Sequence, residues 1–192
     1  WRTLPEHRRF NPHPGRIGMV TLGTGAVVSV DAEHLPAAEL AFGNRHRDLV
    51  FLPESLHRFG ELLEPGLTLY GPGPRFTCPP EALKRSPPPA GYAIEIVDIE
   101  ARIASNQENI ERHDFPHALY QGPGTSGRPT VFAAVAYQGG ELAGMAGMTR
   151  DSDFMWQIGI DVIPAHQGAG LAAALTSAVT AAAFDAGAVP YY

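Results

Sequence analysis

The clearest chemical pattern is a glycine-rich stretch, Gln167-Gly-Ala-Gly-Leu-Ala172. Apolar residues then recur at spacings of three and four, which predicts a long helix that starts within this stretch and ends near Gly187. The first turn of a helix has unpaired backbone N–H groups and a partial positive charge. Because Gly168 and Gly170 have no side chains, a phosphate can approach these groups closely. The stretch is therefore expected to be an anion site built from backbone.

Two other phosphate-binding devices match this stretch less well. A P-loop ends in Gly-Lys-Ser/Thr, which does not occur here. A dinucleotide fingerprint, Gly-x-Gly-x-x-Gly/Ala, is matched formally by Gly168, Gly170 and Ala173. That fingerprint follows a strand of a parallel βαβ unit almost directly, whereas a turn beginning at Pro164 intervenes here. The acidic residue expected about 20 positions later is also missing.

The elements before the stretch are predicted to form an antiparallel meander. The expected hairpin turn at Gln138–Glu141 contains two glycines, which tolerate positive φ. Asp151–Asp153 is a second turn. The predicted strands are Tyr92–Val97, Thr130–Tyr137, Leu142–Thr149 and Phe154–Ile163, with a helix at Ile99–Glu111 and a further strand opening at Val189–Tyr192.

A separate region is expected before a proline-rich connector. Pro87, Pro88 and Pro89 favour a stiff extended chain, so we place an N-terminal region at 1–86, a linker at 87–91 and a second domain at 92–192. The N-terminal elements predicted are a strand at Ala26–Val30, a helix at Ala32–Phe42 capped by Asp31, a helix at Pro53–Leu63 and a strand at Leu67–Tyr70.

The composition limits the class of protein. The chain of 192 residues is 44% hydrophobic and 18% charged, as in ordinary globular proteins. The net charge of −6 argues against a nucleic-acid partner, and no apolar run reaches the roughly 18 residues of a membrane-spanning helix. The single Cys78 excludes an internal disulfide, and no signal peptide is recognisable, so a cytoplasmic location is expected.

In this context the stretch resembles the GNAT superfamily of N-acetyltransferases. The family signature Gln/Arg-x-x-Gly-x-Gly/Ala is matched by Gln167, Gly170 and Ala172, and a preceding strand end, Val-x-Pro, by Val162–Pro164. The resemblance covers about Tyr92–Tyr192. It implies an α/β fold of the α+β type, in which helices flank a mixed, mainly antiparallel sheet, with a smaller α/β region before it.

The resemblance also implies a site for acetyl-CoA as the acyl donor. In this family the strand corresponding to Trp156–Ile163 splays from its neighbour, and its free backbone groups pair with the pantetheine arm. The implied strand positions are Ile160, Asp161, Val162 and Ile163. The implied pyrophosphate-binding amides are those of Gln167, Gly168, Ala169, Gly170, Leu171 and Ala172. An amine would then attack the thioester directly, without an acyl-enzyme.

The catalytic groups are harder to assign. An attacking amine must lose a proton, and Asp161 is the ionisable residue nearest to the implied thioester position. The family's acidic tyrosine would lie beyond Tyr192, so we expect the sequence to be part of a longer chain, with this domain incomplete at its C-terminus. Pro116 interrupts a helix that would carry His113 and His117, which are expected to be solvated, and no metal site is predicted.

The predicted function is transfer of an acetyl group from acetyl-CoA to an amine of a small molecule or a protein. The alternative is a non-catalytic module that binds or senses acyl-CoA. A nucleotide-dependent redox enzyme is a third hypothesis, carried by the dinucleotide fingerprint alone. The expected partners are acetyl-CoA and an amine acceptor, and a homodimer is compatible with this prediction.

Overall fold

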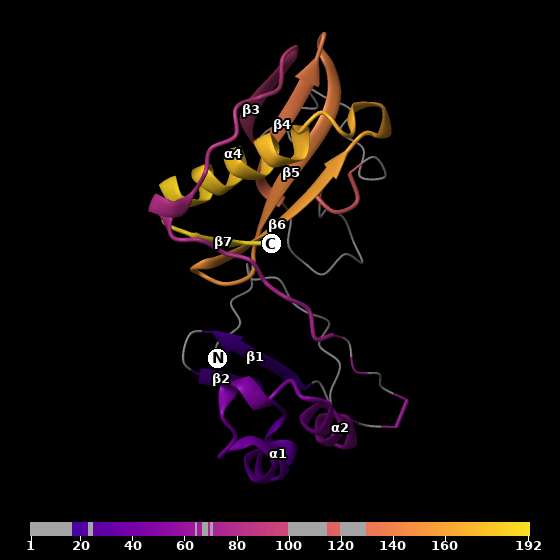
Figure 1. The fold of residues 1–192 in the computed structure, drawn as a ribbon, viewed down its shortest axis with the longest axis vertical. Helices are drawn as coiled ribbons and strands as arrows, with labels where there is room; N and C mark the ends of the chain where they lie inside the picture. The colour runs from indigo at the N-terminus through magenta and orange to yellow at the C-terminus, as the bar shows by residue number, and fades with distance from the viewer. Residues whose placement is uncertain are drawn as a thin grey trace. The chain divides into compact units, whose positions relative to one another are not determined.

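The computed structural model describes residues 17–22, 25–63, 65–66, 69, 71–99, 115–119 and 130–192. The chain divides into two compact units, one ending at Pro74 and the other including Arg75–Tyr192 (Figure 1). Residues 75–86 belong to the second unit: Phe76 and Tyr192 exchange two backbone hydrogen bonds of 2.9 Å. The division thus precedes the linker predicted at 87–91, which lies inside the C-terminal unit.

The N-terminal unit is a hairpin with two short helices. Strands β1 (Gly18–Leu22) and β2 (Gly25–Ser29) pair antiparallel, and α1 (Leu35–Phe42) and α2 (Pro53–Glu61) follow. Its core is built from Ala38, Phe42 and Phe59. The strand β1 was not predicted.

The predicted helix at Ala32–Phe42 begins as a 3-10 turn at Ala32–His34, and Asp31 precedes this turn without a capping hydrogen bond from its side chain. The turn is followed by Leu35-Pro36, and the proline ring fits the first turn of the regular helix. Of the predicted strand at Leu67–Tyr70, only Leu69 lies among the described residues.

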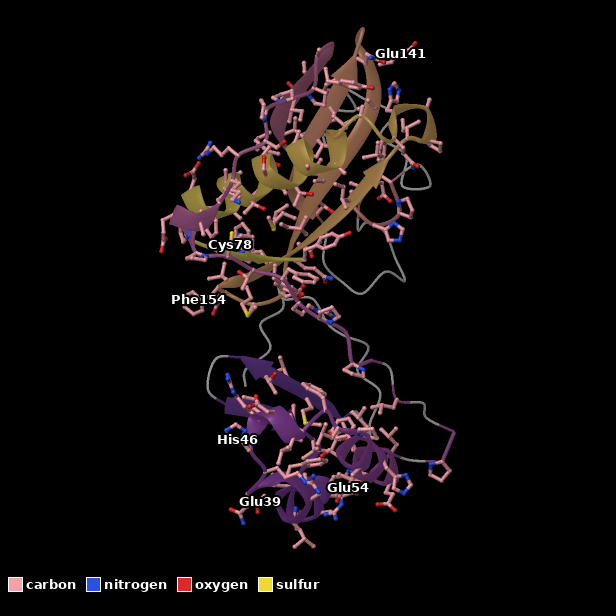
Figure 2. All side chains as sticks on the ribbon, in the orientation of Figure 1. Glu39, His46, Glu54, Cys78, Glu141 and Phe154 are labelled. Atoms are coloured by element: carbon pink, nitrogen blue, oxygen red, sulfur yellow. The ribbon has the colours of Figure 1, made fainter. Side chains whose placement is uncertain are left out.

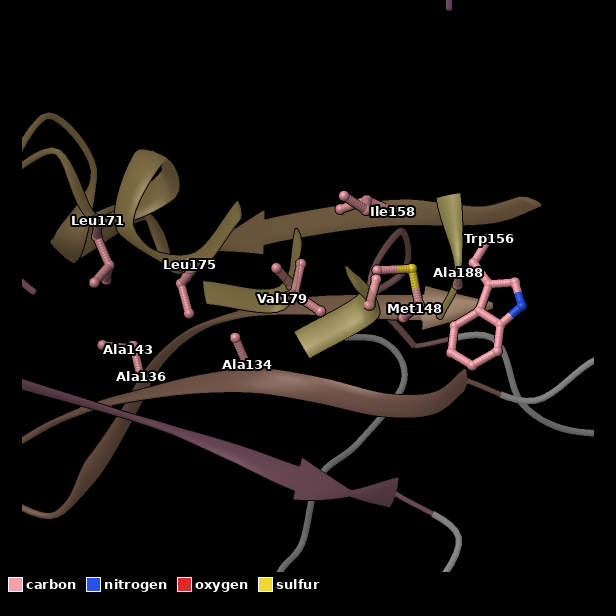
Figure 3. Packing of buried hydrophobic residues seen from close by; sticks show 12 residues of the cluster. Ala134, Ala136, Ala143, Met148, Trp156, Ile158, Leu171, Leu175, Val179 and Ala188 are labelled. Atoms are coloured by element: carbon pink, nitrogen blue, oxygen red, sulfur yellow. The ribbon is translucent and has the colours of Figure 1, made fainter. Parts of the chain in front are cut away.

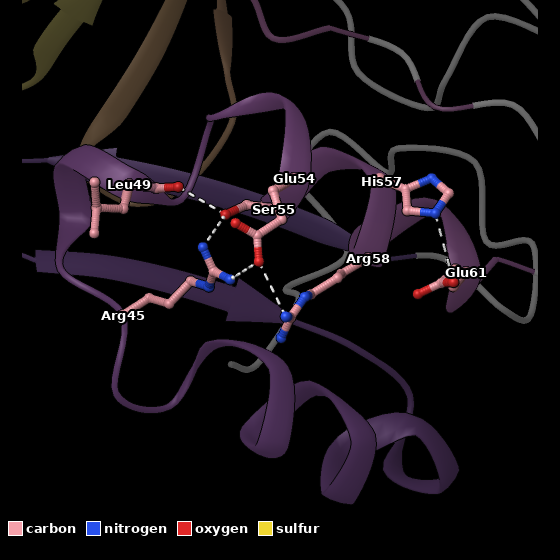
Figure 4. A network of polar contacts seen from close by, with 7 residues as sticks. All are labelled: Arg45, Leu49, Glu54, Ser55, His57, Arg58 and Glu61. Atoms are coloured by element: carbon pink, nitrogen blue, oxygen red, sulfur yellow. Dashed lines mark hydrogen bonds and ion pairs between the residues drawn. The ribbon is translucent and has the colours of Figure 1, made fainter.

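A polar network holds the start of α2 (Figure 4). The fully buried Ser55 hydroxyl donates to the Leu49 carbonyl at 2.7 Å and accepts from Arg45 at 3.0 Å. Arg45 and Arg58 donate to Glu54 at 2.8 and 3.0 Å. The hydrogen bond from Arg45, its charge and that of Arg58 lower the pKa of Glu54. The network contains no nucleophile beside a base, so we assign it a structural role.

The C-terminal unit is built on one five-stranded sheet in the order β3-β4-β5-β6-β7. Neighbouring strands are antiparallel from β3 to β6, whereas β7 is parallel to β6. The parallel pair needs a crossover, which α4 (Leu171–Asp185) provides across one face of the sheet (Figure 1). The strands are β3 (Tyr92–Asp98), β4 (Thr130–Gln138), β5 (Glu141–Arg150), β6 (Met155–Val162) and β7 (Val189–Tyr191).

These elements confirm the predicted fold class and the antiparallel meander. Of the helix predicted at Ile99–Glu111, only Ile99 lies among the described residues. No helix in the described part of the chain has the length and apolar character needed to cross a membrane.

Small residues let α4 pack close to the sheet. Leu171, Leu175 and Val179 of the helix point toward the strands (Figure 3). The facing strand residues include Ala134, Ala136, Ala146, Met148, Trp156 and Ile158. The alanines leave room for the larger helix side chains, so the two layers interdigitate. Trp156 is 6% exposed, so its side chain belongs to this core.

The opposite face is crossed by the segment 115–119. Gly147 of β5 and Gly159 of β6 are register partners beneath it. A Cβ atom at Gly147 would lie 1.8 Å from the Ala118 carbonyl oxygen, and one at Gly159 would lie 1.9 Å from that of His117. Only glycine fits at these positions, because the segment's backbone lies directly on the strands.

Replacing Gly147 by Ala should therefore lift the 115–119 segment and lower the free energy of unfolding by about 3 kcal/mol or more, since the methyl group meets backbone. Urea denaturation followed by the fluorescence of Trp156, with Trp1 replaced by Phe, measures this. Gly144→Ala on the same strand is the control, because its nearest neighbours are 3.1 Å away. An equal effect of both variants would contradict the close crossing.

Candidate active site

Strand β6 loses one of its neighbours partway along its length. Strand β7 pairs with it only over Met155–Gln157, whereas β5 pairs with it as far as Val162. From Ile158 to Val162, no described strand pairs with β6 on the β7 side. The implied pantetheine positions lie on this open edge or directly after it.

The four implied pantetheine positions, 160–163, differ in the direction of their backbone groups. The Ile163 amide donates to the Ala143 carbonyl at 3.0 Å, on the β5 side. Because backbone groups of successive strand residues point to opposite sides, Asp161 also directs its backbone toward β5. Ile160 and Val162 direct theirs to the open edge. Of the four implied positions, these are the two that direct backbone groups to the open edge.

A short turn joins this edge to α4. A 3-10 turn at Pro164–His166 follows Ile163, and Gln167 then adopts an extended conformation. The Gln167 side-chain amide donates to the Val162 carbonyl at 3.0 Å. The Tyr92 hydroxyl lies 3.1 Å from His166 Nδ1. These two contacts fix the glycine-rich stretch relative to the sheet.

The glycines of the stretch are required by conformation. Gly168 and Gly170 have φ of +81° and +82°, a region that favours glycine, and a Cβ atom at either would meet nothing within 4 Å. Tight packing is therefore not the reason for glycine here. The side chain of Leu171 is buried, whereas Gly168, Ala169, Gly170 and Ala172 are exposed. The helical amides of residues 171–173 have no carbonyl partner within α4, as at every helix start.

A cavity of about 570 Å³ is lined by residues of the open part of β6 and of the start of α4. Its lining includes Ile158 and Ile160 of β6, Ala172, Ala173 and Thr176 of α4, and Pro190–Tyr192. Phe76, Thr77, Cys78, Leu83 and Lys84 also line it. The Thr77 hydroxyl donates to the Pro190 carbonyl at 2.9 Å, which ties this segment to β7. The predictions did not include residues 76–84, whose contacts are with residues far along the chain.

A second cavity, of about 460 Å³, lies at the other end of α4. Cys78 and Pro79 line it together with Phe184 and Gly187 (Figure 2 labels Cys78). Its lining contains no charged residue. We therefore do not place the acyl-transfer site in this cavity.

Asp161 points to the face opposite α4. One carboxylate oxygen, Oδ2, accepts the backbone amides of His117 and Ala118, each at 2.7 Å. The other, Oδ1, lies 2.6 Å from His117 Nδ1. The side chain is only 13% exposed. A carboxylate held in this way anchors the 115–119 segment, so its geometry does not support the prediction that Asp161 itself removes the proton.

His117 is exposed as predicted, but its ring is held in place. Its side chain is 73% exposed, and the contact with Asp161 orients the imidazole. The two residues lie 44 positions apart in the sequence. The only local signal for their contact was the pair of isolated glycines in the predicted strands, which marks close backbone approach.

The comparisons with known proteins agree with this architecture. A model of the acetyltransferase (GNAT) family matches residues 94–192, about half of the chain. The chain therefore belongs to the GNAT acetyltransferase family, which confirms the resemblance. A search of curated proteins gives no match.

Solved structures similar to this chain include two GCN5-related proteins. One is a GCN5-related N-acetyltransferase from Kribbella flavida, 21% identical with a TM-score of 0.51, covering 72% of this chain and 53% of that one. The other is a GCN5-related N-acetyltransferase-like protein from Streptococcus suis, 18% identical with a TM-score of 0.40, covering 53% of this chain and 40% of that one. The first similarity shows a shared fold, and the chain spans about half the length of that protein.

Replacing Asp161 by Ala should release the 115–119 segment. Hydrogen bonds to a charged acceptor are worth roughly 1.5–3 kcal/mol each, so exchange of the His117 and Ala118 amides should speed up at least tenfold. Hydrogen exchange followed by NMR measures this. Asp161→Asn is the matched control, because its carbonyl oxygen can still accept both amides. Unchanged protection in Asp161→Ala would contradict the anchoring role.

Proposed function

We propose that this chain is an N-acetyltransferase that moves an acetyl group from acetyl-CoA to the amine of a small molecule or a protein. One observation carries this proposal: a single cavity is lined both by Ile158 and Ile160 on the open part of β6 and by Ala172 and Ala173 in the first turn of α4. An extended pantetheine arm would lie against the residues of β6, and the pyrophosphate would lie beside Ala172, on the amides of residues 167–172. Membership of the GNAT family supports the same arrangement.

The pantetheine arm lies along β6 like an added strand. The backbone groups of Ile160 and the amide of Val162 are directed to this edge, and strand addition uses such groups as donors and acceptors. The Val162 carbonyl already accepts from the Gln167 side chain. The side chain of Ile160 gives the arm an apolar wall. The thioester is then held close to the backbone of Ile160–Val162.

The pyrophosphate lies on the amides of residues 167–172. Its negative charge is stabilised by the amides of the first helical turn and by the dipole of α4. The conformation of Gly168 and Gly170 exposes these amides, and neither glycine has a neighbour that would block the approach. Leu171 contributes its backbone, since its side chain belongs to the core.

An assay of thiol release tests the proposed reaction. With acetyl-CoA and a panel of primary amines and peptides, we expect release of free thiol that depends on the amine, and calorimetry should show that acetyl-CoA binds. Binding without turnover on any amine would favour the non-catalytic acyl-CoA-binding module. Tight binding of NAD without competition from CoA would favour the redox hypothesis.

The variant Gly170→Val tests the position of the pyrophosphate. A bulky residue blocks the phosphate and costs charge-assisted hydrogen bonds of roughly 1.5–3 kcal/mol each, so affinity for CoA should fall at least tenfold. Calorimetry measures this. Gly187→Val is the matched control, because Gly187 also has a positive φ of +75° and open space around it but lies beyond the other end of α4. Equal affinities of the two variants would place the pyrophosphate elsewhere.

A further inference from the structure

We propose that His117 is the general base of the acetyl transfer and that Asp161 is the residue that positions it. This assignment rests on the proposed function, because it concerns the proton that the attacking amine must lose. The base is then the imidazole of His117, and the carboxylate of Asp161 holds that imidazole in place.

The contacts of Asp161 divide between its two oxygens. Oδ2 takes the two backbone amides of the 115–119 segment, which fixes the carboxylate in space. Oδ1 is then directed to the ring of His117, 2.6 Å from Nδ1. A carboxylate can only accept, so a neutral ring in this contact has its proton on Nδ1. Nε2 keeps its lone pair, which is the arrangement that a general base requires.

The backbone bonds alone account for the anchoring of the segment. The contact between Oδ1 and Nδ1 joins a side chain that is 73% exposed, His117, to one that is 13% exposed, Asp161. It holds an accessible imidazole in one orientation and one tautomer. That effect serves proton transfer.

The pair lies at the part of β6 where acyl transfer is proposed. Side chains of successive strand residues point to opposite faces. Ile158 and Ile160 line the cavity on the α4 face, and Asp161 lies on the opposite face, where the His117 carbonyl sits over Gly159. No described strand closes the edge of β6 between Ile158 and Val162. In this proposal the amine approaches the acyl group at this edge from the side of His117.

The reaction then balances as follows. The nitrogen lone pair of a neutral amine forms the new C–N bond at the thioester carbonyl. The C–S bond breaks with its electron pair on sulfur. The proton that the nitrogen loses passes to Nε2 of His117, and the CoA thiolate takes a proton from solvent. His117 returns its proton to solvent before the next turnover, so no further reactant is needed.

The variants His117→Gln and Asp161→Asn test the two roles. General-base catalysis is typically worth roughly 10²-fold or more, so kcat should fall by about that factor in His117→Gln, while KM for acetyl-CoA stays within about twofold. In Asp161→Asn the side-chain oxygen still accepts the backbone amides of His117 and Ala118. The NH₂ group faces Nδ1 as a donor, so Nδ1 must accept and the ring proton moves to Nε2. We expect a similar loss of kcat with the segment still anchored.

His57→Gln is the matched control for an exposed histidine beside a carboxylate. His57 is 78% exposed and lies 3.6 Å from Glu61 in the N-terminal unit, and its replacement should leave kcat unchanged. Nitrogen-15 NMR of the histidine rings gives a readout that needs no substrate. It should show the proton of His117 on Nδ1 in the wild type and on Nε2 in Asp161→Asn.

The outcomes separate the two proposals. A wild type that transfers acetyl groups while His117→Gln keeps its kcat would overturn the assignment of the base and leave the proposed function intact. A neutral wild-type ring with its proton on Nε2 would overturn it as well. A wild type that binds acetyl-CoA but acetylates no amine would overturn the proposed function, and the assignment of a base would fall with it.

Discussion

The close crossing of residues 115–119 over Gly147 and Gly159 is the constraint on which the face of the sheet opposite α4 depends. The carbonyl oxygens of His117 and Ala118 occupy the space where two Cβ atoms would otherwise lie. At this distance the amides of the same residues reach the carboxylate of Asp161. A larger residue at either glycine would lift the segment and separate these partners, so the sheet surface and the polar contact depend on one another.

The two faces of β6 are held by different forces. On the α4 side, leucine, valine and alanine side chains interdigitate, and burial of apolar area supplies the stabilisation. On the other side, a charged acceptor pairs with backbone amides, and geometry matters more than area. Strand β6 belongs to both layers. Its alternation of Ile158, Gly159, Ile160 and Asp161 meets both demands within a single strand.

Local patterns predicted most of the C-terminal fold. Alternating apolar residues and the Gly139-Gly140 turn gave the meander, and spacings of three and four gave α4. The boundary at 87–91 followed from proline content, which indicates a stiff chain but not the surface on which that chain packs. The hydrogen bonds between Phe76 and Tyr192 tie the residues before this connector to the C-terminal unit. They join segments far apart in the sequence. In the N-terminal unit, β1 depends on its pairing with β2 and carried no strong pattern of its own.

In the candidate site, too, contacts between neighbouring residues could be predicted from the sequence and contacts between distant residues could not. The proposed pyrophosphate site at residues 167–172 is contiguous in the sequence. A helix start and its glycines form an anion site from neighbouring residues, so such a site can be predicted from sequence. The contact of His117 with Asp161 exists only because a distant segment crosses the strand at two glycines. The sequence predicted Asp161 as the base from its place on β6. It could not show that both carboxylate oxygens contact His117 and that one also accepts the Ala118 amide. Asp161 was chosen because it lies close to the proposed thioester position. His117 is the stronger candidate for the base, because its contact with Asp161 leaves the lone pair on Nε2.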